Sequence, residues 1–182
     1  GLKFYLPGGE IAKSDEVAIG AALGSGSVSA EMGAFVQDAG AVSTYVARYV
    51  DAFGADALQG LRIGVYEHSS VARDALVDAL SSIGAEVVRL ARADHFIPVD
   101  TEAVDADTRE MLKRWCAEHA LDALVSTDGD ADRPMVVDAR GTLVPGDVLG
   151  PLVGRMLGAD VICTPVSSNT LVDQLGFGSV IR

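Results

Sequence analysis

Residues 61–90, LRIGVYEHSSVARDALVDALSSIGAEVVRL, contain two apolar runs separated by a stretch with helical spacing. Leu61–Tyr66 carries β-branched residues and predicts a strand, and Glu86–Leu90 predicts the next one. Ser69 or Ser70 is the expected cap of the intervening helix. The apolar stripe of this helix is Ala72, Ala75, Leu76, Ala79, Leu80 and Ile83. A strand, a helix and a second strand in this order predict a parallel α/β unit.

The same alternation continues on both sides of this unit. Asp105 opens a predicted helix, Ala123–Ser126 predicts a further strand, and Met135–Asp138 with Thr142–Val144 predicts a hairpin. The inward face of that helix is expected to hold Met111, Leu112, Trp115 and Cys116. Further expected elements are a short helix capped by Ser14 and Asp15, a loop over 24–43, a helix ending at Gly54, strands at 161–164 and 179–181, a short helix at 169–175, and a helix from Asp147 that buries Val148, Leu149, Leu152, Val153, Met156 and Leu157. Ligands are expected beyond the carboxyl ends of the parallel strands.

Composition and charge exclude several classes of function. The chain has 182 residues, of which 49% are hydrophobic and 22% charged, which is typical of a globular protein. Its formal net charge of −12 disfavours nucleic acid and anionic membrane surfaces as partners. No apolar run reaches the roughly 18 residues of a membrane span. The two cysteines, Cys116 and Cys163, are expected to be buried thiols in a reducing cytoplasm.

The most informative motif is Asp128-Gly129-Asp130-Ala131-Asp132-Arg133, directly after a predicted strand. Three carboxylates two residues apart can converge on one hard cation if the backbone turns tightly, and Gly129 is expected to permit that turn. Carboxylate oxygens suit Mg²⁺, and Arg133 adds a cation with the fork geometry that fits a phosphate oxygen. The alternative is a solvated acidic loop, although packing three like charges together costs energy unless a cation neutralises them.

Other metal and phosphoryl-transfer motifs fit less well. An EF-hand loop counted from Asp128 would need Gly and Glu where Arg133 and Ala139 stand. The three histidines share no ligand spacing, so zinc is not expected. Two alternatives stay open: a haloacid-dehalogenase-type phosphatase with Asp128 as the nucleophile, and a non-catalytic metal-binding domain.

Three segments of the chain resemble segments of the α-D-phosphohexomutase family, and they occur in the same order and spacing as in that family. Asp128–Arg133, followed by Val136–Asp138 and Gly141, is similar to the metal-binding loop of that family. Gly1–Phe4 resembles the family's Asn-Gly-x-Lys segment, and Thr164–Leu171 resembles the opening of its third domain. The resemblance covers essentially the whole chain, and it implies that the chain is part of a longer, four-domain enzyme.

The resemblance implies phosphohexomutase-type layered α/β domains with a mixed, mainly parallel sheet. Residues 1–56 would end the first domain, 57–143 would form the second with the metal loop, and 144–182 would begin a truncated third. The serine loop, the sugar-recognition loop and the fourth domain of the family have no counterpart in the chain. One departure is the turn Glu67–Ser70, where the family often has a Gly-rich turn. Because this turn is distant from the metal loop in the sequence, it is expected to be a local structural variation.

The family's roles carry over only onto matching residues. Asp128, Asp130 and Asp132 would hold Mg²⁺, Arg133 would sit near the transferring phosphoryl group, and Lys3 would lie by the reacting hydroxyl. The resemblance implies a phosphotransferase, with phosphomannomutase as the expected member, that interconverts hexose 1- and 6-phosphates through a phosphoserine and a bisphosphate intermediate. The expected partner is a phosphorylated hexose, mannose or glucose phosphate, and the expected location is the cytoplasm.

Overall fold

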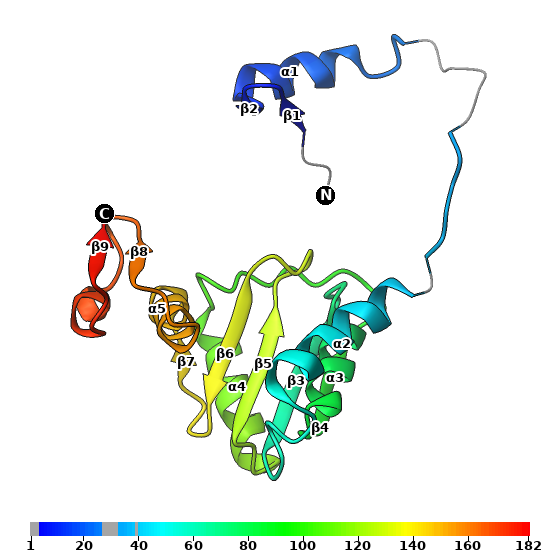
Figure 1. Ribbon diagram of the computed structural model, residues 1–182. Helices are drawn as coiled ribbons and strands as arrows, with labels where there is room; N and C mark the ends of the chain where they lie inside the picture. Colours follow the sequence, from blue (N-terminus) through cyan, green and yellow to red (C-terminus); the bar gives the residue numbers. More distant parts are fainter. Residues whose placement is uncertain (1–3, 27–32, 39) are drawn as a thin grey trace. The chain divides into compact units, whose positions relative to one another are not determined.

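The computed structural model describes residues 4–26, 33–38 and 40–182 and divides into two compact units, Gly1–Ala39 and Gly40–Arg182. The first unit contains an antiparallel pair of short strands, β1 (Tyr5–Leu6) and β2 (Gly9–Glu10), and helix α1 (Lys13–Ala22) (Figure 1). The predicted short helix is confirmed, but its cap is Ala12 rather than Ser14 or Asp15. The Asp15 carboxylate instead accepts a hydrogen bond of 2.9 Å from the Ala12 amide.

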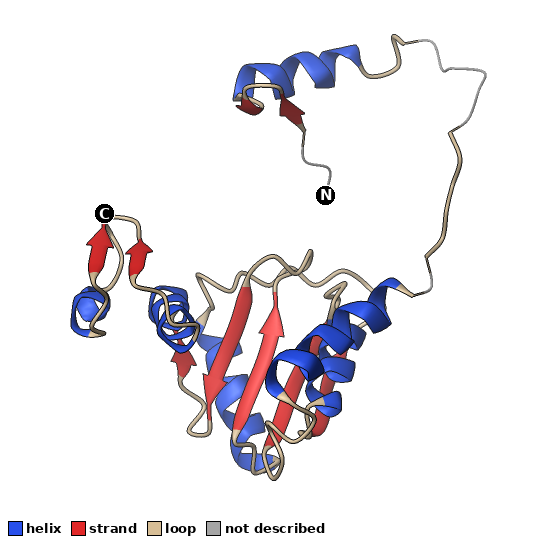
Figure 2. Ribbon diagram, viewed as in Figure 1, coloured by secondary structure: helices blue, strands red, loops and turns tan. Residues whose placement is uncertain are grey.

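The second unit is built on a mixed five-stranded sheet (Figure 2). Its spatial order is β4 (Glu86–Arg92), β3 (Arg62–His68), β5 (Ala123–Thr127), β6 (Pro134–Asp138) and β7 (Leu143–Val144). Strand β3 pairs in parallel with β4 and β5, whereas β6 is antiparallel to both β5 and β7. The predicted α/β class with a mixed sheet is confirmed.

Helices cover both faces of this sheet. Helix α4 (Ala106–Glu118) lies on one face, and α3 (Arg73–Ser82) lies on the other with α2 (Ala41–Phe53) packed beside it (Figure 1). The predicted cap of α4 is confirmed, because Asp105 accepts a 2.8 Å hydrogen bond from the Thr108 amide. In the described ranges, no helix is long and apolar enough to cross a membrane.

The core lies between the sheet and α4. It consists of Tyr66, Leu90, Val104, Leu112, Cys116, Leu121, Leu124, Met135 and Val137. The predicted inward residues of α4 are confirmed, because Leu112 and Cys116 are buried and Met111 and Trp115 pack against the cluster. Gly64 of β3 faces the same side, and a Cβ there would come within 2.6 Å of Leu121. The absence of a side chain at Gly64 therefore lets the core pack closely against β3.

The C-terminal segment departs from prediction in its burial. It contains α5 (Gly146–Met156), parallel strands β8 (Val161–Cys163) and β9 (Ser179–Ile181), and a 3₁₀ helix, η1 (Thr170–Gln174). The expectation that α5 buries a full apolar stripe is wrong: Leu152, Val153, Met156 and Leu157 are exposed. Cys163 is likewise exposed rather than buried. Within the described residues, these α5 side chains and Cys163 are thus not covered by other elements.

Candidate metal centre

The predicted metal-binding residues lie in the loop that joins β5 to β6. These strands form an antiparallel hairpin that the sequence pattern did not predict, and the Asp128 amide donates to the Arg133 carbonyl at 3.1 Å across its base. The residue that turns the backbone is Ala131, with φ of 65°, so the expectation that Gly129 makes the tight turn is wrong. Gly129 has a different use, because a Cβ there would lie 3.3 Å from the ring of Phe96.

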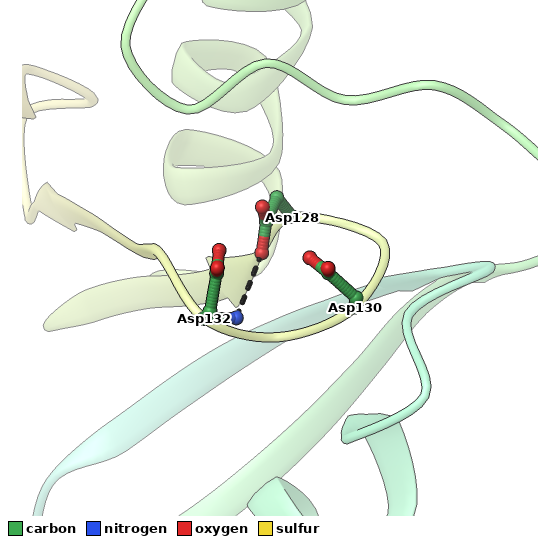
Figure 3. A group of neighbouring side chains, drawn as sticks. All are labelled: Asp128, Asp130 and Asp132. Carbon is green, nitrogen blue, oxygen red and sulfur yellow. Dashed lines mark hydrogen bonds between the residues drawn. The ribbon is translucent and has the colours of Figure 1, made fainter. Parts of the chain in front are cut away.

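The loop brings the three predicted carboxylates together. Asp128, Asp130 and Asp132 each offer an oxygen, and these oxygens lie within 4.8 Å of one another (Figure 3). Asp128 is buried at the base of the loop, whereas Asp130 and Asp132 are exposed. A set of oxygen donors with one buried and two exposed members can hold a hard cation and leave positions for other ligands.

Asp128 is the most constrained of the three. Its Oδ1 accepts hydrogen bonds from the amides of Asp132 at 3.1 Å and Arg133 at 3.2 Å, and its Oδ2 accepts from Arg133 Nε at 3.1 Å. Burial raises the pKa of Asp128, but hydrogen bonds from the Arg133 backbone, Asp132 and the Arg133 guanidinium outweigh it and hold the pKa below its usual value. A carboxylate has about four lone-pair sites, so at least one remains for a cation.

Arg133 extends from the same loop into a group of acidic side chains. In addition to the contact with Asp128, nitrogens of its guanidinium lie 3.6 Å from a carboxylate oxygen of Asp132, 3.4 Å from one of Glu102 and 4.0 Å from one of Asp100. Burial lowers the pKa of Arg133, but Asp128 and the other carboxylates raise it further, so the side chain stays charged. Asp100 and Glu102 carry no recognisable motif, and sequence reasoning missed them.

A second turn, residues 67–71 at the end of β3, packs against the metal loop. His68 Nε2 lies 2.8 Å from the Thr127 carbonyl, Ser70 Oγ lies 2.7 Å from Thr127 Oγ1, and the Val71 amide donates to the Gly129 carbonyl at 3.1 Å. The turn is distant from the metal loop in the sequence but contacts it in the structure, because β3 and β5 are neighbours in the sheet and end at the same edge. The interpretation of the turn as a local variation therefore missed these contacts.

The serines of this turn do not cap α3 as predicted. The N-cap of α3 is Ala72, which has no side-chain cap. Ser69 Oγ instead accepts a hydrogen bond from the Ile97 amide at 2.8 Å, which links the turn to the segment after β4. Lys3, the remaining predicted site residue, lies outside the described residues.

Comparison with known proteins identifies the relatives of this chain. Residues 43–141 match the family model "Phosphoglucomutase/phosphomannomutase, alpha/beta/alpha domain II". A phosphomannomutase of Sinorhizobium fredii is 45% identical over 190 residues, covering 100% of this chain and 40% of the relative. A phosphomannomutase of Salmonella muenchen is 42% identical, covering 97% of this chain and 37% of the relative. A phosphoglucosamine mutase of Symbiobacterium thermophilum is 32% identical over 80% of this chain and 33% of its own length.

Solved structures show the same fold. A phosphoglucomutase/phosphomannomutase family protein from Burkholderia thailandensis superimposes with a TM-score of 0.68 at 16% identity, covering 99% of this chain and 47% of that protein. The chain spans about 40% of the length of the first two phosphomannomutases. The matched domain and the sequence identity to these phosphomannomutases agree with the resemblance of the metal loop, and the chain therefore belongs to the phosphoglucomutase/phosphomannomutase family, the α-D-phosphohexomutases.

Proposed function

We propose that the natural protein carrying this chain is a Mg²⁺-dependent phosphomannomutase of the cytoplasm. It would interconvert mannose 1-phosphate and mannose 6-phosphate through a phosphoserine and a bisphosphate intermediate. The observation that carries this proposal is the carboxylate triad at the carboxyl edge of the sheet, in a chain 45% identical to a phosphomannomutase. Mannose is favoured over glucosamine because the phosphomannomutases are 42–45% identical and the phosphoglucosamine mutase of Symbiobacterium is 32% identical.

The residues present fit a magnesium ion. Their donors are carboxylate oxygens, which Mg²⁺ prefers, and the exposure of Asp130 and Asp132 leaves room for water or a phosphate oxygen. When bound there, Mg²⁺ would neutralise charge on the transferring phosphoryl group, which is a main requirement of phosphoryl transfer. The hydrogen bonds to Asp128 hold its carboxylate in the loop before any ion arrives.

Two cationic side chains complete the proposed chemistry. Arg133 stays charged beside the triad, and its guanidinium can bind phosphate oxygens once it leaves Glu102. Lys3 is proposed to lie by the reacting hydroxyl and to assist proton transfer there. In the proposed domain division, residues 1–56 end the first domain, 57–143 form the second and 144–182 begin the third.

The geometry argues against Asp128 as the nucleophile of a phosphatase. Its side chain is 5% exposed, and three hydrogen bonds already use its oxygens. A nucleophile must approach phosphorus in line with the leaving group, and burial of Asp128 at the base of the loop leaves little room for that approach. Trapping of a phosphoaspartate at Asp128 would nevertheless reverse this conclusion.

The test is conversion of mannose 1-phosphate by the natural protein, followed by ³¹P NMR with Mg²⁺ and again with EDTA. Asp130→Asn removes one proposed ligand, and we expect turnover to fall at least ~100-fold because transition-state charge is no longer neutralised. Asp78→Asn, an exposed aspartate on α3, is the matched control and should leave turnover unchanged. Undiminished turnover in Asp130→Asn would contradict the proposal. Metal binding without turnover in the wild type would indicate a non-catalytic metal-binding protein instead.

A further inference from the structure

His68 has an unusual conformation for a residue at the end of a strand. Its backbone φ is 30°, in the left-handed region that side chains other than glycine seldom adopt, and its side chain is fully buried. Such strained backbone persists only where surrounding contacts hold it, and it clusters at functional sites. The contacts made by His68 therefore indicate which functional feature requires this backbone conformation.

The imidazole of His68 is held by a hydrogen bond and by an aromatic contact. Because the Thr127 carbonyl can only accept, the 2.8 Å contact requires that His68 Nε2 carries the proton and donates it. The ring also packs on Tyr66 at 5.0 Å between centroids, and Tyr66 in turn packs on Trp115 at 5.3 Å between centroids. The other ring nitrogen, Nδ1, is buried and has no hydrogen-bond partner among the described residues. The hydrogen bond to Thr127 is thus the polar contact that orients this ring.

This hydrogen bond acts at the start of the metal loop. Thr127 is the residue immediately before Asp128, and its hydroxyl is also held by Ser70 at 2.7 Å. Gly129, immediately after Asp128, is held through its carbonyl by the Val71 amide. Both neighbours of Asp128 are therefore attached to the turn that contains His68.

We propose that His68 is a positioning residue of the metal centre. By donating from Nε2 to the Thr127 carbonyl, it fixes the backbone from which Asp128 projects, and so keeps the Asp128 carboxylate directed toward Asp130 and Asp132. His68 touches neither the metal ligands nor the substrate in this scheme. The proposal rests on the metal site of the proposed function, which supplies the ion that the positioned carboxylates bind.

Two substitutions separate the hydrogen bond from the volume of the side chain. In His68→Gln, the amide nitrogen reaches the position of Nε2 and can still donate to Thr127. In His68→Asn, the shorter amide stops near the position of Nδ1, although asparagine tolerates left-handed backbone well. Isothermal titration calorimetry of the EDTA-treated natural protein should show that His68→Gln binds Mg²⁺ with an affinity within about threefold of wild type. For Asn it should be ~10-fold or more weaker, as for loss of other residues that orient metal ligands.

Hydrogen exchange gives a second readout that does not depend on metal. The amides of Asp132 and Arg133 donate to Asp128, so they should exchange faster in the Asn variant and at the wild-type rate in the Gln variant. Ile83→Ala, a change of a buried residue at the C-cap of α3, should lower stability while leaving both the Mg²⁺ affinity and these two exchange rates unchanged.

Equal Mg²⁺ affinities in His68→Asn and His68→Gln would overturn the proposal and leave His68 as a packing residue. A wild type that binds no Mg²⁺ would overturn the proposed metal site. The exchange contrast between the two variants would in that case still report whether His68 holds the loop.

Discussion

The ion-pair network of Glu67 and Asp74 with Arg89 and Arg92 gives a specific prediction about stability. Glu67 is 2% exposed and its Oε1 accepts from Arg89 Nε at 2.8 Å, Arg89 Nη2 at 2.5 Å and Arg92 Nη1 at 3.1 Å. The same arginines bind Asp74, whose side chain is 59% exposed. The buried carboxylate is therefore shared by two half-exposed cations, with a solvated carboxylate as their second partner.

Glu67→Gln removes the buried charge and keeps the volume of the side chain. Breaking a buried pair costs about 3–5 kcal/mol when a charge is left unpaired. Here the arginines remain half-exposed and keep Asp74, so we expect a loss of about 2 kcal/mol in the free energy of unfolding. Asp74→Asn is the matched control, and its exposure limits the expected loss to below ~1 kcal/mol.

Urea unfolding followed through the fluorescence of Trp115, the one tryptophan of this 182-residue chain, measures both variants. With an m-value of about 1–3 kcal/mol/M, a 2 kcal/mol loss moves the midpoint by roughly 1 M. A shift for Glu67→Gln no larger than that for Asp74→Asn would refute the reasoning, because burial of Glu67 would then add nothing.

Three further predictions concern other parts of the chain. Hydrogen bonds from Arg92 and Arg89 lower the pKa of Asp74 from its usual 3.8 to about 2, so its stabilising contribution is present above pH 4 and is lost as the pH falls toward 2. The stability difference between wild type and Asp74→Asn should shrink over that window in urea titrations, and a constant difference would contradict this. Gly141→Ala should lower unfolding free energy by roughly 2–4 kcal/mol, because φ is +79° and a Cβ would meet the backbone of Lys113; an unchanged urea midpoint would contradict it. A thiol reagent should modify exposed Cys163 at least ~10-fold faster than Cys116, whose burial raises its thiol pKa, and equal rates in mass spectra would show that Cys116 is accessible.

The strands and most helices of the second unit could be predicted because apolar runs mark the strands and helical spacing of apolar residues marks the helices. Strand β3 follows from the short apolar run Leu61–Tyr66 with its β-branched residues, and Gly54 ends α2 with a φ of 86°. Such signals are local, so a single sequence carries them. The prediction of burial in the C-terminal segment was wrong because burial depends on long-range packing. The apolar pattern of α5 does not indicate which element, if any, covers it.

The triad was predictable from spacing, but its surroundings were not. Asp128 and its two partners lie within five residues, so one turn of backbone brings them together. Glu102 reaches Arg133 only because the segment after β4 runs past the metal loop, and no local pattern signals that. The sequence marks the turn Glu67–Ser70 as a departure from a Gly-rich turn, but it does not single out His68 within that turn. Its meaning depends on the pairing of β3 with β5, which brings residues 59 positions apart into contact.

Direct Mg²⁺ titration tests the central claim, that Asp128, Asp130 and Asp132 form a metal centre. The natural protein, stripped with EDTA, would be titrated calorimetrically alongside Asp130→Asn and the control Asp78→Asn. We expect one Mg²⁺ site in the wild type and in Asp78→Asn. In Asp130→Asn the affinity should fall by more than the ~10–100-fold typical of losing a residue behind a metal ligand. An unchanged isotherm in Asp130→Asn, or no binding in the wild type, would contradict the account.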